Sequence, residues 1–192
     1  MKKIFVLLIL CFTASGVFSQ AFMHGAGVGV FVDKARYSDA KAYGTLIYSP
    51  RVNFVETETM ALSVGIPITI GFSGSYTSNS YSGDSGDFGF LFNAPVVVNI
   101  NMGRGSTKDN ESKFGYFAGA GFGYHYGART FIDEYYDYNE SSTFSAYGPA
   151  ANAGVRIGVG RSHKNIEILL SYMRGIDDSK ANIYGLSTLF NF

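Results

Sequence analysis

The sequence is poor in the residues and patterns that mark several large classes of protein. It has no tryptophan and a single cysteine, Cys11. After residue 20 there is no run of eighteen consecutive apolar residues, which argues against a helical membrane protein. Helical periodicity is nearly absent as well. The chain carries 15 basic and 15 acidic residues, so no excess of positive charge predicts nucleic-acid binding.

The first nineteen residues have the composition of a secretory signal peptide. Two lysines precede an apolar run at 4–12, and small and polar residues follow it. A lipoprotein leader is disfavoured because Leu10, rather than a small residue, precedes Cys11. We expect cleavage after Ser19, which leaves 13 basic residues (15 minus the two lysines) against 15 acidic ones, a net charge of −2. Residues 20–192 then form one cysteine-free domain of about 170 residues.

The sequence does contain a strong alternation, with a period of two, between large apolar residues and small or polar ones. The clearest example runs from Met60 to Phe72, and a second one runs from Phe88 to Asn101. Because successive side chains of a strand point to opposite faces, each such segment predicts a strand with one apolar face. The same pattern predicts eight strands along the chain, over 23–32, 43–55, 59–72, 88–101, 113–126, 143–159, 164–174 and 181–192.

The segments between these strands alternate between short turns and long loops. The two longest polar stretches, 73–87 and 127–142, both fall where long loops are expected. A strand of about thirteen residues, at about 3.3 Å per residue and tilted by about 45°, rises roughly 30 Å, the thickness of a hydrocarbon core. Such an arrangement around an even number of strands is typical of a transmembrane barrel. The 102–112 turn does not fit, since it is long where a short turn is expected.

The apolar faces indicate which side of the barrel is the outside. Each predicted strand has a continuous face of large apolar residues, whereas its other face carries Gly, Ser, Thr, Asn and a few charges. The interior of an eight-stranded barrel is just wide enough for side chains, so about seven large residues per strand would not fit there. Lipid would solvate them. The sequence therefore predicts an all-β fold, an eight-stranded antiparallel transmembrane β-barrel with up-and-down connections.

Three charged residues fall on the polar faces and so point into the lumen: Arg51, Arg156 and Glu167. A buried charge without a partner is costly. We therefore predict a lumen charge network in which Glu167 pairs with Arg156, with Arg51 or with both. The alternative is a water-filled lumen in which no pairing is needed.

Glycines line one face of 115–127, with Gly119, Gly121 and Gly123 at alternate positions and Phe117 among them. A phosphate-binding loop would need its third glycine at position 124, where Tyr124 stands, and a helix after it. We interpret the segment as barrel wall whose glycines face a narrow lumen. They would leave space there for the long side chains of the predicted charge network.

The segments HGAGVGVFV (24–32), YSPRVNFV (48–55), GYFAGAGFGYHYG (115–127) and GLSTLFNF (185–192) resemble the small outer-membrane β-barrel proteins common in Bacteroidetes. The architecture of that family is similar to that of the OmpA transmembrane domain and of OmpX. The resemblance implies the outer membrane of a Gram-negative bacterium, with periplasmic termini and long extracellular loops. It also implies contact with outer-membrane lipid and with the barrel-assembly machinery, but not one particular activity.

The end of the chain resembles the C-terminal signal that the assembly machinery recognises in such barrels. That signal is a terminal aromatic residue preceded by alternating apolar residues, although Ser187 stands where many members have Gly. The residues that match it are Tyr184, Leu186, Phe190 and Phe192.

Few side chains suggest catalysis or metal binding. The three histidines of the mature chain lie in different strands or turns without metal-ligand spacing, so we expect no metal and no cofactor. Small barrels that modify lipid A use a His with a Ser and an acid, and His125, Ser142 and Glu134 could fill those roles, but no local motif brings them together. The acids of the two polar stretches could bind calcium, but they lack the spacing of a calcium loop. We expect them to keep the loops soluble.

Tyrosines gather in the two polar stretches, beside Asp, Ser and Asn. Exposed tyrosine with such neighbours makes a good contact surface for proteins or sugars. The alternative is an aromatic girdle that anchors the loop bases at the membrane interface. The residues of this predicted loop interaction surface are Tyr76, Tyr81, Tyr135, Tyr136 and Tyr138.

We therefore predict a non-enzymatic outer-membrane barrel with a structural or surface-interaction role. It would act alone or as an accessory subunit of an envelope complex, in contact with other outer-membrane or surface proteins. A narrow channel for small solutes is the first alternative, suggested by the glycine-lined inner faces. A lipid A-modifying enzyme is the second.

Overall fold

The computed structural model describes residues 22–36, 39–79, 83–133, 138–160 and 164–192, which form nine strands. No helix in these segments is long and apolar enough to cross a membrane. The predicted signal peptide, 1–19, lies outside them. The strands are β1 (Phe22–Lys34), β2 (Lys41–Glu56), β3 (Met60–Gly65), β4 (Ile68–Asn79), β5 (Gly83–Gly103), β6 (Phe114–Asp133), β7 (Tyr138–Gly158), β8 (Asn165–Arg174) and β9 (Asn182–Asn191).

The sheet closes on itself because β1 pairs with β2 on one side and with β9 on the other. Around the ring the order is β1, β9, β8, β7, β6, β5, then β3 with β4, then β2. β3 and β4 share one position, since each pairs with both β2 and β5. The ring therefore has eight strand positions and antiparallel neighbours throughout, as the sequence predicted.

The predicted strand 59–72 is broken into β3 and β4 at Ile66 and Pro67. Proline has no N–H to donate to a sheet ladder, so pairing is interrupted there. The Ile66 N–H instead donates to the Pro50 carbonyl oxygen at 3.1 Å. β3 pairs with the half of β2 that begins at Arg51, and β4 pairs with the half that ends at Tyr48. The break bends the wall without opening the ring.

Large apolar side chains cover the outside of the barrel and polar ones line much of the inside. Leu46 and Leu170 are 63% and 58% exposed, whereas Asn101, His125 and Arg156 are at most 1% exposed. An apolar layer crosses the middle of the lumen, formed by buried residues that include Phe31, Ile47, Leu91, Phe117, Leu169 and Ile183. This inside-out distribution agrees with the prediction from alternation, because only lipid favours so much exposed apolar surface.

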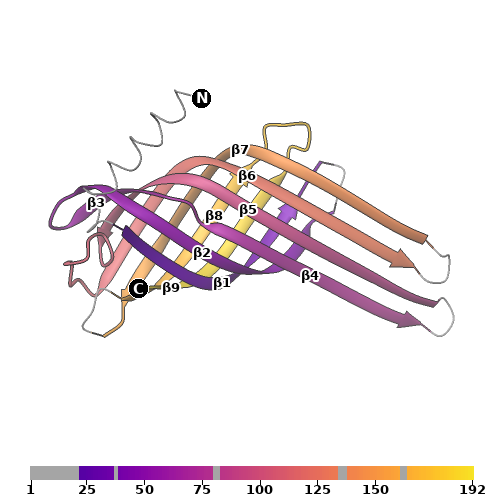
Figure 1. Ribbon diagram of the computed structural model, residues 1–192, viewed down its shortest axis with the longest axis horizontal. Helices are drawn as coiled ribbons and strands as arrows, with labels where there is room; N and C mark the ends of the chain where they lie inside the picture. Colours follow the sequence, from indigo (N-terminus) through magenta and orange to yellow (C-terminus); the bar gives the residue numbers. More distant parts are fainter. Residues whose placement is uncertain (1–21, 37–38, 80–82, 134–137, 161–163) are drawn as a thin grey trace, which may run out of the picture.

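One side of the barrel is much taller than the other. β5, β6 and β7 have 20 or 21 residues, whereas β8 and β9 have 10 each. In Figure 1, β4 to β7 continue far beyond the rest of the ring, away from the end that holds the C-terminus. We call the outermost part of these two hairpins the extended wall; it comprises 73–79, 83–89, 129–133 and 138–142.

The extended wall corrects the prediction of long loops at 73–87 and 127–142. Most of these residues continue the strands, and the β4–β5 and β6–β7 ladders run to their tips. The alternation of large apolar residues fades there because neither face needs to meet lipid. Backbone pairing persists, and Thr, Tyr and Phe in these stretches favour strands. Tyr76 and Tyr138 therefore lie in strands rather than in loops.

Candidate functional site

The end of the barrel that holds the C-terminus contains a buried ion cluster, which we call the Glu167 network. Arg156 Nε donates to Glu167 Oε2 at 2.6 Å, and Arg51 Nη1 lies 3.6 Å from the same oxygen. Arg156 and Glu167 are register partners on β7 and β8, whereas Arg51 reaches them from β2. None of the three is more than 7% exposed. The structure thus brings together the three charged residues that alternation placed in the lumen.

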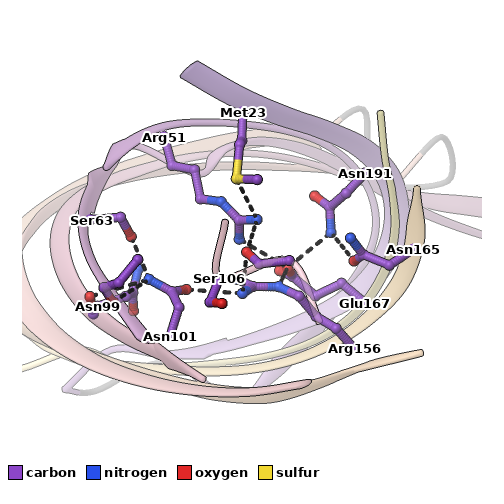
Figure 2. Close-up of polar contacts among 12 residues, drawn as sticks. Met23, Arg51, Ser63, Asn99, Asn101, Ser106, Arg156, Asn165, Glu167 and Asn191 are labelled. Carbon is purple, nitrogen blue, oxygen red and sulfur yellow. Dashed lines mark hydrogen bonds and ion pairs between the residues drawn. The ribbon is translucent and has the colours of Figure 1, made fainter. Parts of the chain in front are cut away.

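Neutral side chains complete the Glu167 network. Asn191 Nδ2 donates to Glu167 Oε2 at 3.0 Å and to Asn165 Oδ1 at 2.8 Å. Arg156 Nη1 donates to Asn101 Oδ1 at 2.9 Å, and its guanidinium lies 4.2 Å from the centre of the Phe117 ring. Figure 2 shows the polar side chains of the Glu167 network, among them Arg51, Arg156 and Asn191, pointing into the ring from different sides.

The long turn between β5 and β6 folds into this mouth of the barrel. Arg104, Ser106 and Asn110 are buried, and the carbonyl oxygen of Gly105 accepts from Arg51 Nη2 at 2.9 Å and from Arg156 Nη1 at 3.3 Å. Two arginines face one glutamate here, so the dipole of the Gly105 carbonyl offsets part of the surplus positive charge. The unexpected length of the 102–112 turn thus has a structural reason, since the turn closes the mouth.

Any residue other than glycine at position 105 would strain the backbone. Its φ of +70° lies in the left-handed region that side chains rarely adopt. A Cβ there would also lie 3.0 Å from Arg156 Cδ and from Asn165 Nδ2. The conformation of the turn and the packing of the Glu167 network therefore depend on the same residue.

The glycines of β6 do not make room for the Glu167 network, contrary to the prediction. A Cβ added at Gly121 would collide with the Val96 carbonyl oxygen on β5, and one added at Gly119 would collide with the Asn99 side chain and the Val98 carbonyl oxygen. These glycines allow the backbones of two strongly curved strands to approach closely on the concave side of the wall. A narrow ring has high curvature, so the lumen-facing positions are the ones that become crowded.

A second buried cluster, which we call the Asp33 network, lies nearer the extended wall. The Asp33 carboxylate on β1 accepts a hydrogen bond from Arg129 Nη2 on β6, and its Oδ2 lies 3.5 Å from His125 Nε2. Asp33 and His125 are fully buried, and Tyr43 beside them is 1% exposed. Arg129 Nη1 also donates to the Asp39 carbonyl oxygen at 2.8 Å, which fixes the connection between β1 and β2. Among the described residues, His125 has no hydrogen-bond partner for either ring nitrogen.

Both networks cross the lumen. β1 and β6 lie four places apart in the ring of eight, as do β2 and β7, so Asp33 and Arg129, like Arg51 and Arg156, come from opposite sides. Two lumen cavities, one beside the Glu167 network and one in the apolar layer, are each about 20 Å³. A space of that size holds about one water molecule. The side chains therefore fill most of the cross-section of the lumen.

Sequence reasoning missed Asp33 and Arg129 because both were assigned to loops. The predicted strands 23–32 and 113–126 end two and seven residues before β1 and β6 do. If the predicted strands had been extended to those ends, alternation would have placed Asp33 and Arg129 on the lumen face together with His125. It also missed Asn101 and Asn191 as members of the Glu167 network, although both lie on the polar faces of their strands. The sequence indicated on which face of a strand each side chain lies, but not which residue it contacts across the lumen.

The residues considered for lipid A modification are not brought together. His125 faces the lumen and pairs in register with Ala146, whereas Ser142 is four residues further along β7, roughly 13 Å away, and exposed. Glu134 lies outside the described residues. The acid that the structure places beside His125 is Asp33.

The acids of the polar stretches do not form a metal site in the part of the chain that the structure describes. There, no group of three or more His, Cys, Asp or Glu side chains could hold a metal ion. Asp87 instead accepts from Lys41 Nζ at 2.6 Å, an ion pair between β5 and the start of β2.

The predicted loop interaction surface is only partly described. Tyr81, Tyr135 and Tyr136 lie outside the described residues, and Tyr76 and Tyr138 are placed only as members of β4 and β7.

The four residues of the predicted assembly signal all project outward from the end of the chain. Tyr184, Leu186, Phe190 and Phe192 are between 42% and 53% exposed. The Phe192 N–H donates to the His24 carbonyl oxygen at 3.0 Å, and the two rings lie 4.3 Å apart. The last residue of the chain is therefore held against the first strand.

Two solved structures resemble this one over nearly its whole length. The crystal structure of Ail, the attachment invasion locus protein of Yersinia pestis, in complex with the heparin analogue sucrose octasulfate, has a TM-score of 0.54 and 16% identity. The match covers 89% of this chain and 97% of Ail. Neisserial surface protein A has a TM-score of 0.55 and 12% identity, over 88% of this chain and 95% of its own. The fold is that of a small outer-membrane β-barrel.

No protein-family model and no curated protein matches the sequence. At identities of 12% and 16% the likeness establishes the fold. What Ail binds in its crystal structure is a property of Ail.

Proposed function

We propose that this protein is a non-enzymatic outer-membrane barrel that binds other surface proteins through the edges of its extended wall, alone or as an accessory subunit of an envelope complex. The observation that carries the proposal is the unequal height of the barrel. β5 to β7 have about twice as many residues as β8 and β9, and the excess lies at one end. A purely structural barrel has no need of such an extension.

The extended wall has two edges with no neighbouring strand among the described residues. β4 last pairs with β2 at Phe72, so 73–79 pair only with β5. β7 last pairs with β8 at Ala150, so 138–149 pair only with β6, apart from one hydrogen bond from Ile176 N to Tyr147 O. Unpaired N–H and C=O groups on an edge strand are a template for an added strand. The partner chemistry that fits is an extended polypeptide segment.

The remaining expectations form part of the same proposal. The extended wall would be extracellular and the termini periplasmic, after removal of a signal peptide at 1–19. Tyr184, Leu186, Phe190 and Phe192 would be recognised by the assembly machinery. The four segments of the sequence resemblance support a barrel of the type common in Bacteroidetes.

Shortening the hairpins tests the proposal. Replacing 76–86 by Asn-Gly leaves Ser75 opposite Asp87, and replacing 131–140 by Asn-Gly leaves Thr130 opposite Ser141, so both variants keep register around a two-residue turn. We expect at least a tenfold loss of partners crosslinked in native membranes from one or both variants. Replacement of 57–59 by Asn-Gly at the other end is the matched control and should change nothing. An unchanged set of partners from both shortened, correctly folded barrels would contradict the proposal.

A channel function is disfavoured by the filled lumen. The Glu167 network and the inserted turn occupy one mouth, and the apolar layer crosses the middle. We expect no single-channel conductance from the purified barrel in planar bilayers. A steady conductance that changes with Arg51→Met or Arg156→Met would favour the channel instead.

A further inference from the structure

The low side of the barrel, opposite the extended wall, carries an ordered pattern on its outer surface. At the hairpin end, Lys34 on β1, Asn182 on β9 and Arg174 on β8 are register partners in one row. Alternation directs all three side chains outward, and both cations are exposed. Neither cation has an ion-pair partner among the described residues. Two unpaired positive charges therefore lie about 10 Å apart, two strand spacings, at the rim of the apolar surface.

Two apolar rows follow directly below the charged row. The first contains Val32, Tyr184 and Tyr172 in register, and the Tyr172 hydroxyl donates to Asn182 Oδ1 at 2.9 Å. The two tyrosine rings lie 5.1 Å apart. The next row contains Val30, Leu186 and Leu170. From the rim inward, the surface thus changes from cationic to aromatic to aliphatic within two rows.

A groove runs through the two apolar rows. It is shallow and wide open, with about 590 Å³ of space over a predominantly apolar lining. On β7 the outward side chains beside Tyr172 and Leu170 are only Ala151 and Ala153, which are too small to fill the surface. The groove is therefore a hollow between larger neighbours, at the height where the end of a lipid tail nearest its headgroup would lie.

We propose that this surface of β1, β9, β8 and β7 binds a phosphate-bearing lipid, with its headgroup between Lys34 and Arg174 and one acyl chain in the groove over Ala151 and Ala153. The proposal is independent of the surface-interaction function, which uses the edges of the extended wall, although β7 contributes residues to both surfaces. A phosphate attracts both cations, and Tyr172 and Tyr184 suit the boundary between headgroup and hydrocarbon. The acids nearest the row, Asp177 and Asp178, lie in the 175–180 connection together with Lys180.

A second copy of the chain fits this surface less well. Symmetric barrels in one membrane associate about an axis along the membrane normal, which places equivalent rows at equal height. The Lys34–Arg174 row of each copy would then face the same row of the other copy. Like charges in contact disfavour that arrangement, whereas an anionic lipid neutralises them.

Lipid binding to the purified, delipidated barrel in detergent, followed by native mass spectrometry, tests the proposal. Phosphatidylglycerol and phosphatidylcholine with identical acyl chains are the probes. We expect the wild type to prefer phosphatidylglycerol by about 30-fold, the combined effect of two interfacial cations. Lys34→Gln with Arg174→Gln should reduce that preference to less than about threefold. The matched control, Lys113→Gln with Lys164→Gln, changes two exposed cations at the other end and should leave it intact.

The groove is tested by filling it. Ala153→Leu should weaken the binding of both lipids at least fivefold, whereas Ala118→Leu, on the outer face of β6 and outside the groove, should not. Heat-modifiable migration on a gel shows which variants have folded, and Ala151→Val is the milder second variant. Equal affinity of the wild type for the two lipids, or equal effects of Ala153→Leu and Ala118→Leu, would overturn the proposal. So would formation of a dimer that Ala153→Leu abolishes, since that outcome assigns the groove to a second copy.

Discussion

The Glu167 network and the Asp33 network lie towards opposite ends of one lumen, and each joins strands on opposite sides of the ring. The Glu167 carboxylate accepts from Arg156 and Asn191 through one oxygen, with Arg51 3.6 Å away. The Asp33 carboxylate accepts from Arg129, while its second oxygen faces His125 at 3.5 Å without a hydrogen bond. In the first network Arg51 Nε has no hydrogen-bond partner among the described residues, whereas in the second Asp33 Oδ2 and both ring nitrogens of His125 have none.

The difference follows from what covers each network. The 102–112 turn enters the barrel over the Glu167 network, and its Gly105 carbonyl oxygen accepts from both arginines, so water has little access. The Asp33 network lies below the extended wall, and the Arg129 side chain remains 16% exposed. Removal of one charged partner should therefore lower the free energy of unfolding by its full amount in the Glu167 network. In the Asp33 network water can hydrate the remaining charge, so the loss of stability should be smaller. Four substitutions test this comparison.

Glu167→Gln should have the largest effect. It leaves the guanidinium groups of Arg51 and Arg156 buried together without a counter-charge, which costs about 3–5 kcal/mol of unfolding free energy. Urea unfolding in lipid vesicles measures it, with the exposed Glu111→Gln as the control. Unchanged resistance to heat or urea would show that the pair has no structural role.

Gly105→Ala should destabilise the barrel by about 2 kcal/mol, because it forces a left-handed φ on alanine and pushes a Cβ against Arg156. Gly160→Ala is a matched control, since Gly160 has the same φ of +70° and nothing within 4 Å of its added Cβ. The same unfolding experiment should give a smaller loss for the control. Equal losses would mean that backbone strain alone acts at Gly105 and that the turn does not support the network.

Asp33→Asn should cost less than Glu167→Gln, about 1.5 kcal/mol, because the partly exposed Arg129 can regain hydration. A double-mutant cycle with Arg129→Met isolates the pair, and we expect a coupling of about 1 kcal/mol. A loss of unfolding free energy as large as that of Glu167→Gln would show that water is excluded equally from both networks, which would contradict the difference argued above.

His125→Leu should have the smallest effect, about 1 kcal/mol or less, since the imidazole makes no hydrogen bond that leucine would forfeit. His24→Leu, beside Phe192 at the end of the barrel that holds the C-terminus, is the reference for a histidine outside the lumen. Thermal unfolding at neutral pH compares the two variants. A loss above about 3 kcal/mol would mean that His125 pairs with Asp33 as a full ion pair.

The sequence predicted which residues lie on each face of the strands, and from those faces it predicted a barrel with an apolar outer surface. Alternation along 60–72 and 88–101 placed large apolar residues outward, and alternation along 43–55, 143–159 and 164–174 put Arg51, Arg156 and Glu167 on the inner face. It could do so because a strand has a fixed period of two, and one face must suit lipid while the other suits a narrow lumen. The same rule failed in the extended wall, where the alternation of large apolar residues fades.

The sequence did not predict which residues contact one another in the lumen. The face on which a side chain lies follows from the local sequence, whereas contacts across the barrel depend on the whole ring. Arg51 meets Glu167 only because closure of the ring brings β2 opposite β7 and β8, and Asp33 meets Arg129 for the same reason. Strand tilt and stagger set the height at which each inward side chain arrives, and a single sequence does not specify them. The position of the 102–112 turn in the barrel mouth also depends on the closed ring. Closure brings Arg51 and Arg156 together, and the Gly105 carbonyl oxygen of the turn accepts hydrogen bonds from both. The sequence by itself thus determined which residues face inward, and the closed ring decided which of them touch.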